Sequence, residues 1–103
     1  MIFKEINLQA HTVEAIATEL MFEIAGARVD KCEVLCVNMF EFEPKQEATI
    51  MRTLKELKKK GLIQFFATSD SFLEEKTEAI FMMNKYSSFI DVNAGKKNIY
   101  IKL

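Results

Sequence analysis

The sequence predicts an α+β fold in which three helices precede a C-terminal antiparallel β-hairpin or meander. The first observation is an amphipathic helix over residues 45–60 that ends at Gly61 and passes directly into an apolar strand. The second is a helical pattern over 12–26, and the third is an apolar segment, 31–40, that suits either a helix or a strand. If 31–40 is a strand, the alternative is an open α/β sheet of strand–helix–strand (βαβ) units.

The N-terminal region predicts a strand and a helix. Residues 3–8 alternate enough for a short strand, although an extension that caps the next helix is an equal alternative. The following helix begins at Thr12 and carries one apolar stripe, formed by Val13, Ile16, Leu20 and Ile24. We expect Gly26 to end this helix, because glycine readily adopts the left-handed conformation that closes a helix.

Residues 31–40 support two interpretations. Asp30 and Glu33 have the spacing of a capping box, which favours a helix that begins here. The run from Glu33 to Phe40 is also continuously apolar and has the length of a strand. Periodicity alone does not separate a buried helix segment from a buried strand, so this segment decides between the two folds.

The central helix has clear start and stop signals. Pro44 is tolerated in a first helical turn, and lysines 58–60 lie at the negative end of the helix dipole. Its buried stripe consists of Ile50, Leu54 and Leu57. We expect Gly61 to close the helix in a left-handed conformation and a strand to follow at Leu62.

The C-terminal third predicts strands. A turn at Asp70 and Ser71 favours a hairpin between strands 62–68 and 77–83. Ser71 and Glu74 also match a capping box, so a helix from Ser71 through Met83 is the alternative. A final strand over residues 99–103 follows in either fold.

One segment of this chain resembles a known family. Residues 49–63 follow the pattern Thr-hydrophobe-x-Arg-x-Leu-x-x-Leu-x-x-x-Gly-Leu-Ile, which is that of the recognition helix and first wing strand in winged helix-turn-helix proteins. Residues 80–84, 86–89 and 96–101 resemble the wing and tail of plasmid or phage replication initiators. The resemblance implies a winged helix-turn-helix domain that binds duplex DNA in replication initiation or transcriptional regulation.

The same resemblance implies which side chains contact DNA. The recognition helix would enter the major groove, with Arg52 making a bidentate contact to guanine or holding a phosphate. Lys55 and Lys59 would meet phosphates, and four further residues would face the groove. The full set is Lys45, Gln46, Thr49, Arg52, Thr53, Lys55 and Lys59.

Composition limits these expectations. A chain of 103 residues, half of them hydrophobic, forms one core, so we expect a single domain over 1–103. Its net charge of -1 provides no general attraction for nucleic acid, and Glu41, Glu43 and Glu47 would repel phosphate near the entry of the basic helix. DNA binding would therefore need a local patch, a dimer or a partner protein. No long apolar run or signal peptide is found, so we expect a cytoplasmic protein with no membrane contact.

The sequence offers little for catalysis. It contains no paired carboxylates, no metal-ligand cluster, no glycine-rich phosphate loop and no nucleophile with its base, so we predict a protein that is not an enzyme and has no cofactor or metal. Cys32 and Cys36 are expected to be buried thiols, with a redox or metal role as the minor alternative. His11 lies at a helix start, where a cap or a surface position is expected.

Two other classes of function are alternatives to DNA binding. The six methionines and nine phenylalanines are most simply core residues, but they could also form a dimer interface or the surface of a non-enzymatic regulator, such as a small phage or plasmid protein that binds a host protein. Residues 7–15, Asn-Leu-Gln-Ala-His-Thr-Val-Glu-Ala, resemble the opening motif of small MutS-related nuclease domains. Asn7, Gln9 and Ala10 stand where that family has Asp, His and Gly, and Asn38-Met39 stand near its His-Gly motif. This resemblance implies a degenerate nucleic-acid-binding domain on an α/β sheet.

Overall fold

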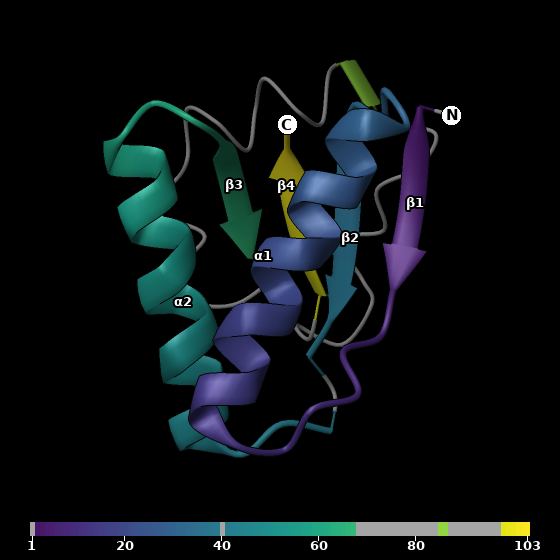
Figure 1. Ribbon diagram of the computed structural model, residues 1–103. Helices are drawn as coiled ribbons and strands as arrows, with labels where there is room; N and C mark the ends of the chain where they lie inside the picture. The colour runs from purple at the N-terminus through teal and green to yellow at the C-terminus, as the bar shows by residue number, and fades with distance from the viewer. Residues whose placement is uncertain (1, 40, 68–84, 87–97) are drawn as a thin grey trace.

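The computed structural model describes residues 2–39, 41–67, 85–86 and 98–103. Its elements, in chain order, are β1 (Phe3–Ile6), α1 (Val13–Val29), β2 (Val34–Asn38), α2 (Pro44–Lys59), β3 (Gln64–Ala67) and β4 (Asn98–Lys102). The four strands form one sheet in the order β1-β2-β4-β3. β1 is parallel to β2, and β4 is antiparallel to both β2 and β3 (Figure 1). β1, β2 and β3 therefore share one direction, and the described part of the chain forms a two-layer α+β fold.

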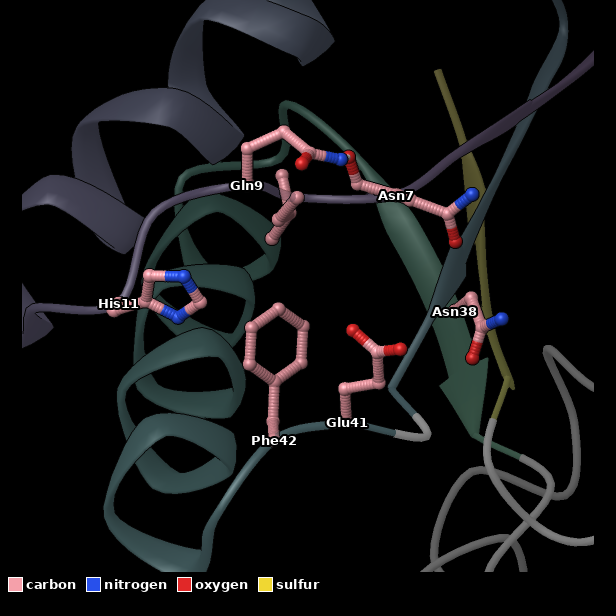
Figure 2. Close-up of a pocket in the computed structure, with 7 residues that line it drawn as sticks. Asn7, Gln9, His11, Asn38, Glu41 and Phe42 are labelled. Carbon is pink, nitrogen blue, oxygen red and sulfur yellow. Dashed lines mark hydrogen bonds between the residues drawn. The ribbon is translucent and has the colours of Figure 1, made fainter.

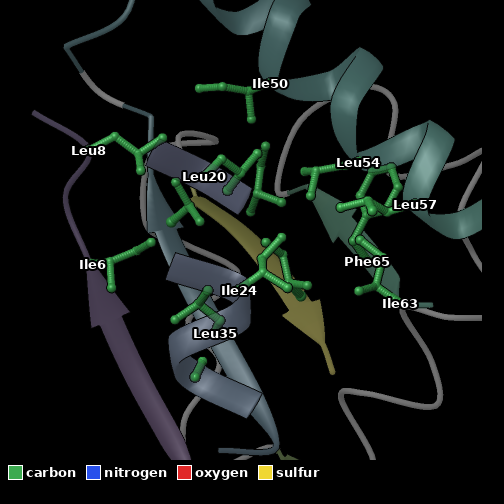
Figure 3. Close-up of a cluster of buried hydrophobic side chains, with 14 of the residues drawn as sticks. Ile6, Leu8, Leu20, Ile24, Leu35, Ile50, Leu54, Leu57, Ile63 and Phe65 are labelled. Carbon is green, nitrogen blue, oxygen red and sulfur yellow. The ribbon is translucent and has the colours of Figure 1, made fainter. Parts of the chain in front are cut away.

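The core lies between the sheet and the two helices. Side chains of one sheet face, among them Leu35, Phe65 and Ile101, are fully buried, and the register places Ile101 between the other two. α1 and α2 close this core from the same side with Leu20, Ile24, Ile50, Leu54 and Leu57, which Figure 3 shows facing the side chains of the sheet. Burial of these apolar side chains is the main force that holds the helices to the sheet.

The prediction of three helices is wrong, because Val34–Asn38 is a strand. β2 pairs with β1 on one side and with β4 on the other. Leu35 and Val37 face the helices, whereas Val34 and Cys36 face the opposite side of the sheet, and all four are buried. A strand buried on both faces is continuously apolar and shows no alternation, which is why the sequence pattern was ambiguous. The described order, strand, helix, strand, helix, strand, strand, begins like the alternative α/β interpretation, but β4 lies antiparallel between β2 and β3, so the sheet is mixed.

α1 is longer than predicted, because Gly26 does not end it. The helix continues to Val29, and Asp30 is its C-cap, with the Asp30 N–H donating to the Gly26 carbonyl at 3.0 Å. Lys31 adopts the left-handed conformation, with φ of 57°. The apparent capping box at Asp30 therefore closes one helix instead of opening another. The chain then enters β2, where the N–H groups of Glu33 and Val34 donate to the Ile2 carbonyl.

α2 confirms the predicted helix over 45–60 within one residue at each end. Pro44 occupies the first turn, and Glu43 and Gln46 form a capping box. Gly61 is left-handed, with φ of 73°, as its position after the last lysines predicts. Within the described residues, neither α1 nor α2 is long and apolar enough to cross a membrane.

The predicted C-terminal winged hairpin is also wrong. β3 pairs with β4, which begins at Asn98, and β4 lies in the middle of the sheet between β3 and β2. The strand that follows the basic helix is thus part of a mixed sheet and not the first strand of a wing. The final strand, predicted at 99–103, is observed at Asn98–Lys102. The expected strand over 77–83 and the alternative helix from residue 71 lie outside the described residues.

Candidate functional site: a polar pocket at the ends of β1 and β2

The candidate site lies where the two parallel strands end. The carboxyl ends of β1 and β2 lie at the same edge of the sheet, and the described residues that follow them, 7–12 after β1 and 39 and 41–43 after β2, precede α1 and α2. The N-terminal ends of both helices therefore lie at this edge.

Glu19 of α1 holds the first of these segments in place. Its Oε1 and Oε2 atoms accept the Gln9 backbone N–H at 3.0 and 2.9 Å, and Oε1 accepts the Ala10 N–H at 2.8 Å. Thr12 caps the same helix, its Oγ1 accepting the Ala15 N–H at 3.2 Å. Two backbone N–H groups that belong to neither a helix nor a strand thus find a charged acceptor, which fixes the loop above the first turns of α1.

Gln46 of α2 joins the second segment to the first. Its Oε1 accepts the Glu43 backbone N–H at 2.8 Å, and its Nε2 donates to the His11 carbonyl at 2.8 Å. The Phe42 N–H donates to the Met39 carbonyl at 3.2 Å, which tightens the turn after β2. One glutamine side chain therefore connects the two loops, through a bond to a residue 35 positions earlier in the sequence.

Between the two loops lies a pocket of about 390 Å³. Its lining residues are Asn7, Leu8, Gln9, His11, Asn38, Glu41 and Phe42. Figure 2 shows His11 beside the Phe42 ring at one end of the row, Asn7 and Asn38 at the other, and the Glu41 carboxylate between them. Phe42 is half-buried, whereas the polar lining side chains belong to exposed residues. The pocket combines several hydrogen-bonding groups with one aromatic ring.

Three of the five polar side chains in this lining are carboxamides. Asn7, Gln9 and Asn38 have carboxamide side chains, which donate and accept hydrogen bonds but do not act as acids or bases near neutral pH. His11 and Glu41 are the titratable groups of the lining. In the described part of the chain no three His, Cys, Asp or Glu residues are grouped as metal ligands would be. The amide groups and the helix N-termini can instead hydrogen-bond a polar ligand.

The seven residues predicted to contact DNA are divided between the helix surface and the interior. Thr49 is buried, and its Oγ1 donates to the Lys45 carbonyl at 3.1 Å. Thr53 donates to the Thr49 carbonyl at 2.9 Å, and Gln46 bridges the two loops as described above. These three side chains therefore form hydrogen bonds within the protein itself. Lys45, Arg52, Lys55 and Lys59 are exposed.

Three of the exposed cations lie together on the outer side of α2. Arg52, Lys55 and Lys59 line a shallow hollow with Ala48, Met51 and Glu56. Lys58 is turned towards the sheet, with its Nζ 5.8 Å from the centre of the Phe65 ring. The local basic patch that DNA contact requires is therefore present on α2, although Glu56 lies within it. Contact with DNA through this patch stays a prediction.

The two cysteines are buried, as predicted, and lie in different surroundings. The Cys32 Sγ donates to the Val34 carbonyl at 3.1 Å. Cys36 faces the side of the sheet away from the helices, where burial, together with the charge of Glu5, raises the pKa of its thiol to about 12. A thiol with so high a pKa is not a nucleophile at neutral pH.

The main lining residues of the pocket were not among the predicted site residues. His11 was expected to be a cap or surface residue, and Glu41 was considered only as a charge that repels phosphate. The one sequence signal for this site was the resemblance of residues 7–15 to the opening motif of small MutS-related domains, together with Asn38 near a second motif. The two segments form one site because the parallel pairing of β1 and β2 brings Asn7, Gln9 and Asn38 to the same pocket.

Comparison of the chain with models of known protein families, with curated proteins and with solved structures finds no significant match.

Proposed function

We propose that this chain is a non-catalytic nucleic-acid-binding domain that recognises bases of a single-stranded segment in the pocket at the ends of β1 and β2. The observation that carries the proposal is the pocket lining, in which three carboxamides, an imidazole and a carboxylate share one pocket with an aromatic ring. Asparagine and glutamine form paired hydrogen bonds with adenine, and glutamate accepts from the amino group of cytosine. Aromatic side chains stack on unpaired bases, and sequence-specific RNA recognition mostly uses such bases.

The resemblance of residues 7–15 to small MutS-related domains supports this proposal. Asn7 and Gln9 take the positions of an acid and a histidine in that motif, and neither replacement can transfer a proton in hydrolysis. Both still form hydrogen bonds. The substitutions therefore remove the chemistry and keep the polar character of the surface, which is the pattern expected of a domain that binds nucleic acid without cutting it.

The electrostatics favour bases over a long stretch of phosphates. The net charge is -1, and Glu41 lies in the pocket itself. The positive ends of two helix dipoles lie at this edge and Lys45 is exposed in the first turn of α2, but Glu14, Glu43 and Glu47 lie at the same helix starts and repel phosphate. We therefore expect binding to depend less steeply on salt than it does for a protein that neutralises many phosphates.

A second candidate is duplex DNA binding by α2, in replication initiation or transcription. It is favoured by one observation, the joint exposure of Arg52, Lys55 and Lys59 around one hollow. A protein of this kind would bind through phosphates, with a strong salt dependence. Both candidates are consistent with a cytoplasmic protein that keeps Cys32 and Cys36 as free thiols.

Two matched double variants separate the candidates. Asn7→Ala/Gln9→Ala removes two exposed side chains from the pocket and its rim, and Arg52→Ala/Lys55→Ala removes two from α2. Fluorescence anisotropy is measured with labelled random single-stranded RNA, single-stranded DNA and duplex DNA, each at two salt concentrations. We expect the parent protein to prefer a single strand and the pocket variant to weaken that binding at least about tenfold, the loss of one good bidentate contact.

The expected result for the α2 variant is a much smaller change. If the α2 variant loses binding and the pocket variant does not, the site lies on α2 and the second candidate is correct. If the folded parent protein binds none of the three nucleic acids at low salt, both proposals are refuted and a protein partner becomes the better hypothesis.

A further inference from the structure

The outer face of α1 is apolar and exposed. It consists of Thr18, Phe22, Ala25 and Val29, which recur at helical spacing and are all exposed, Phe22 at 73% and Val29 at 82%. The opposite side of the helix is the buried one, with Ile16, Leu20, Ile24 and Ala27. A helix that is apolar on both sides is normally covered on both sides. Exposed large apolar side chains grouped in this way mark an interaction surface.

The two flanks of α1 define where this outer face points. On one flank, the Arg28 guanidinium donates to the Leu62 carbonyl in the connection between α2 and β3. On the other flank, Glu19 holds the loop after β1. The outer face lies between these flanks, on the side of α1 away from the sheet, and Figure 1 shows no described helix or strand over that side of α1. Phe22 and Val29 are both exposed there.

We propose that this face pairs with the same face of a second copy of the chain, the two α1 helices running antiparallel. The order along the face is small, large, small, large, at intervals of four, three and four residues. When this order is reversed in a second helix, every large side chain meets a small one. Phe22 packs on Ala25 of the second copy, and Val29 packs on Thr18 of the second copy, in the knobs-into-holes manner of paired helices.

The small residues of the outer face leave room for the large side chains of the second copy. The Thr18 hydroxyl donates to the Glu14 carbonyl of its own helix at 3.1 Å, so its hydrogen-bonding need is met without a partner. Beside Thr18 is a hollow whose other lining residues are Ala10, Thr12, Glu14, Ala15, Glu19 and Phe22. Val29 of the second copy would lie at this hollow.

Gly26 is a second and independent indication. It lies inside α1 next to the outer face, and a Cβ atom added there would meet nothing within 4 Å. Its backbone is helical, so neither space nor conformation within one chain requires glycine. Glycine weakens a helix relative to alanine, and its presence is explained if a second helix approaches closely at this point.

A second copy fits this face better than a membrane or a charged partner. The four positions carry no charge, whereas α1 also bears Glu14, Glu19 and Glu23, which would be repelled by an anionic lipid surface. Antiparallel pairing also places the helix dipoles in opposite directions. Four residues on each copy, two of them small, bury less than the roughly 1,000 Å² expected of a specific stable interface, so the dimer should be weak and dissociate on dilution.

The test is sedimentation of the full chain over a concentration series, with three variants of exposed residues. Phe22→Ala removes the large side chain, and Ala25→Phe places a large side chain against Phe22 of the second copy. We expect each to weaken dimerisation at least about tenfold. The double variant Phe22→Ala/Ala25→Phe exchanges large and small and restores the complementarity, so we expect it to recover the dimer. Circular dichroism shows that each variant is folded.

Three results would overturn the proposal. The first is a parent protein that remains a monomer at the highest concentration reached. The second is a tighter dimer in Ala25→Phe, which would indicate general apolar attraction instead of the proposed register. The third is a double variant that fails to recover what the single variants lose. None of these results depends on whether the polar pocket binds nucleic acid.

Discussion

Replacing Glu19 with glutamine tests the link between the fold and the polar pocket. The carboxylate accepts two backbone N–H groups through three N···O distances of 2.8, 2.9 and 3.0 Å. A hydrogen bond to a charged group contributes about 1.5–3 kcal/mol in a folded protein, and the partial exposure of this site lowers that value. The amide keeps one acceptor oxygen, so we expect Glu19→Gln to reduce the free energy of unfolding by about 1–2 kcal/mol.

The assay combines urea denaturation with amide hydrogen exchange measured by NMR. A loss of this size lowers the thermal midpoint by roughly 4–8 °C for each kcal/mol in a domain of about this length. The N–H groups of Gln9 and Ala10 should exchange faster in the variant, because their acceptor is weakened. Glu14→Gln is the matched control. It also removes one negative charge from α1, here in the first turn, and the Glu14 side chain makes no described contact with the loop.

The control should cost only the helix-dipole contribution, about 0.3–1 kcal/mol, and leave the exchange of Gln9 and Ala10 unchanged. If Glu19→Gln leaves both the exchange rates and the denaturation midpoint at the values of the parent protein, the carboxylate does not hold the loop. The account of how α1 positions the pocket would then be incorrect.

Two further predictions concern stability. Burial raises the pKa of the Cys36 thiol from 9.0 to about 12, so the contribution of this thiol to the free energy of unfolding is complete below pH 9 and falls as the pH rises towards 12, by up to about 1.4 kcal/mol per pH unit. In urea denaturation above pH 9, the stability of Cys36→Ala should therefore decline less steeply with pH than that of the parent protein. Parallel plots of stability against pH for the two proteins would contradict this assignment. Gly61 is left-handed, so Gly61→Ala should destabilise the fold by about 1–2 kcal/mol, whereas Gly26→Ala, in a helical backbone with open space, should stabilise the dilute monomer by about 0.5–1 kcal/mol. Thermal denaturation of both variants measures this contrast, and equal effects of the same sign would refute it.

The candidate site was difficult to predict because its residues are ordinary polar side chains in loops. Asn7, Gln9 and Asn38 have no spacing that distinguishes them from surface residues, and they are assembled by the parallel pairing of two strands about thirty residues apart. The basic residues of α2, in contrast, are easy to recognise in the sequence. The lysines and Arg52 of this helix are visible there, but Thr49 is buried, and the Thr49 and Thr53 hydroxyls donate to carbonyls one turn earlier in α2.

The sequence by itself determined the local elements whose signals are local. α2 follows from the spacing of Ile50, Leu54 and Leu57 and from the stop at Gly61, and the helix after Thr12 follows from its own apolar stripe. These signals depend on interactions within a few residues, so no distant part of the chain is needed to interpret them.

Only the tertiary structure decided the fold and the site. Val34–Asn38 became a strand because β1 and β4 hydrogen-bond to it on both sides and because both of its faces are buried, and these conditions come from segments far away in the sequence. Because of this pairing the fold is a mixed sheet and not the predicted winged helix, and the polar ends of β1 and β2 lie together. Strand pairing is non-local, and for this reason the decisive interactions could not be derived from any one segment of the chain.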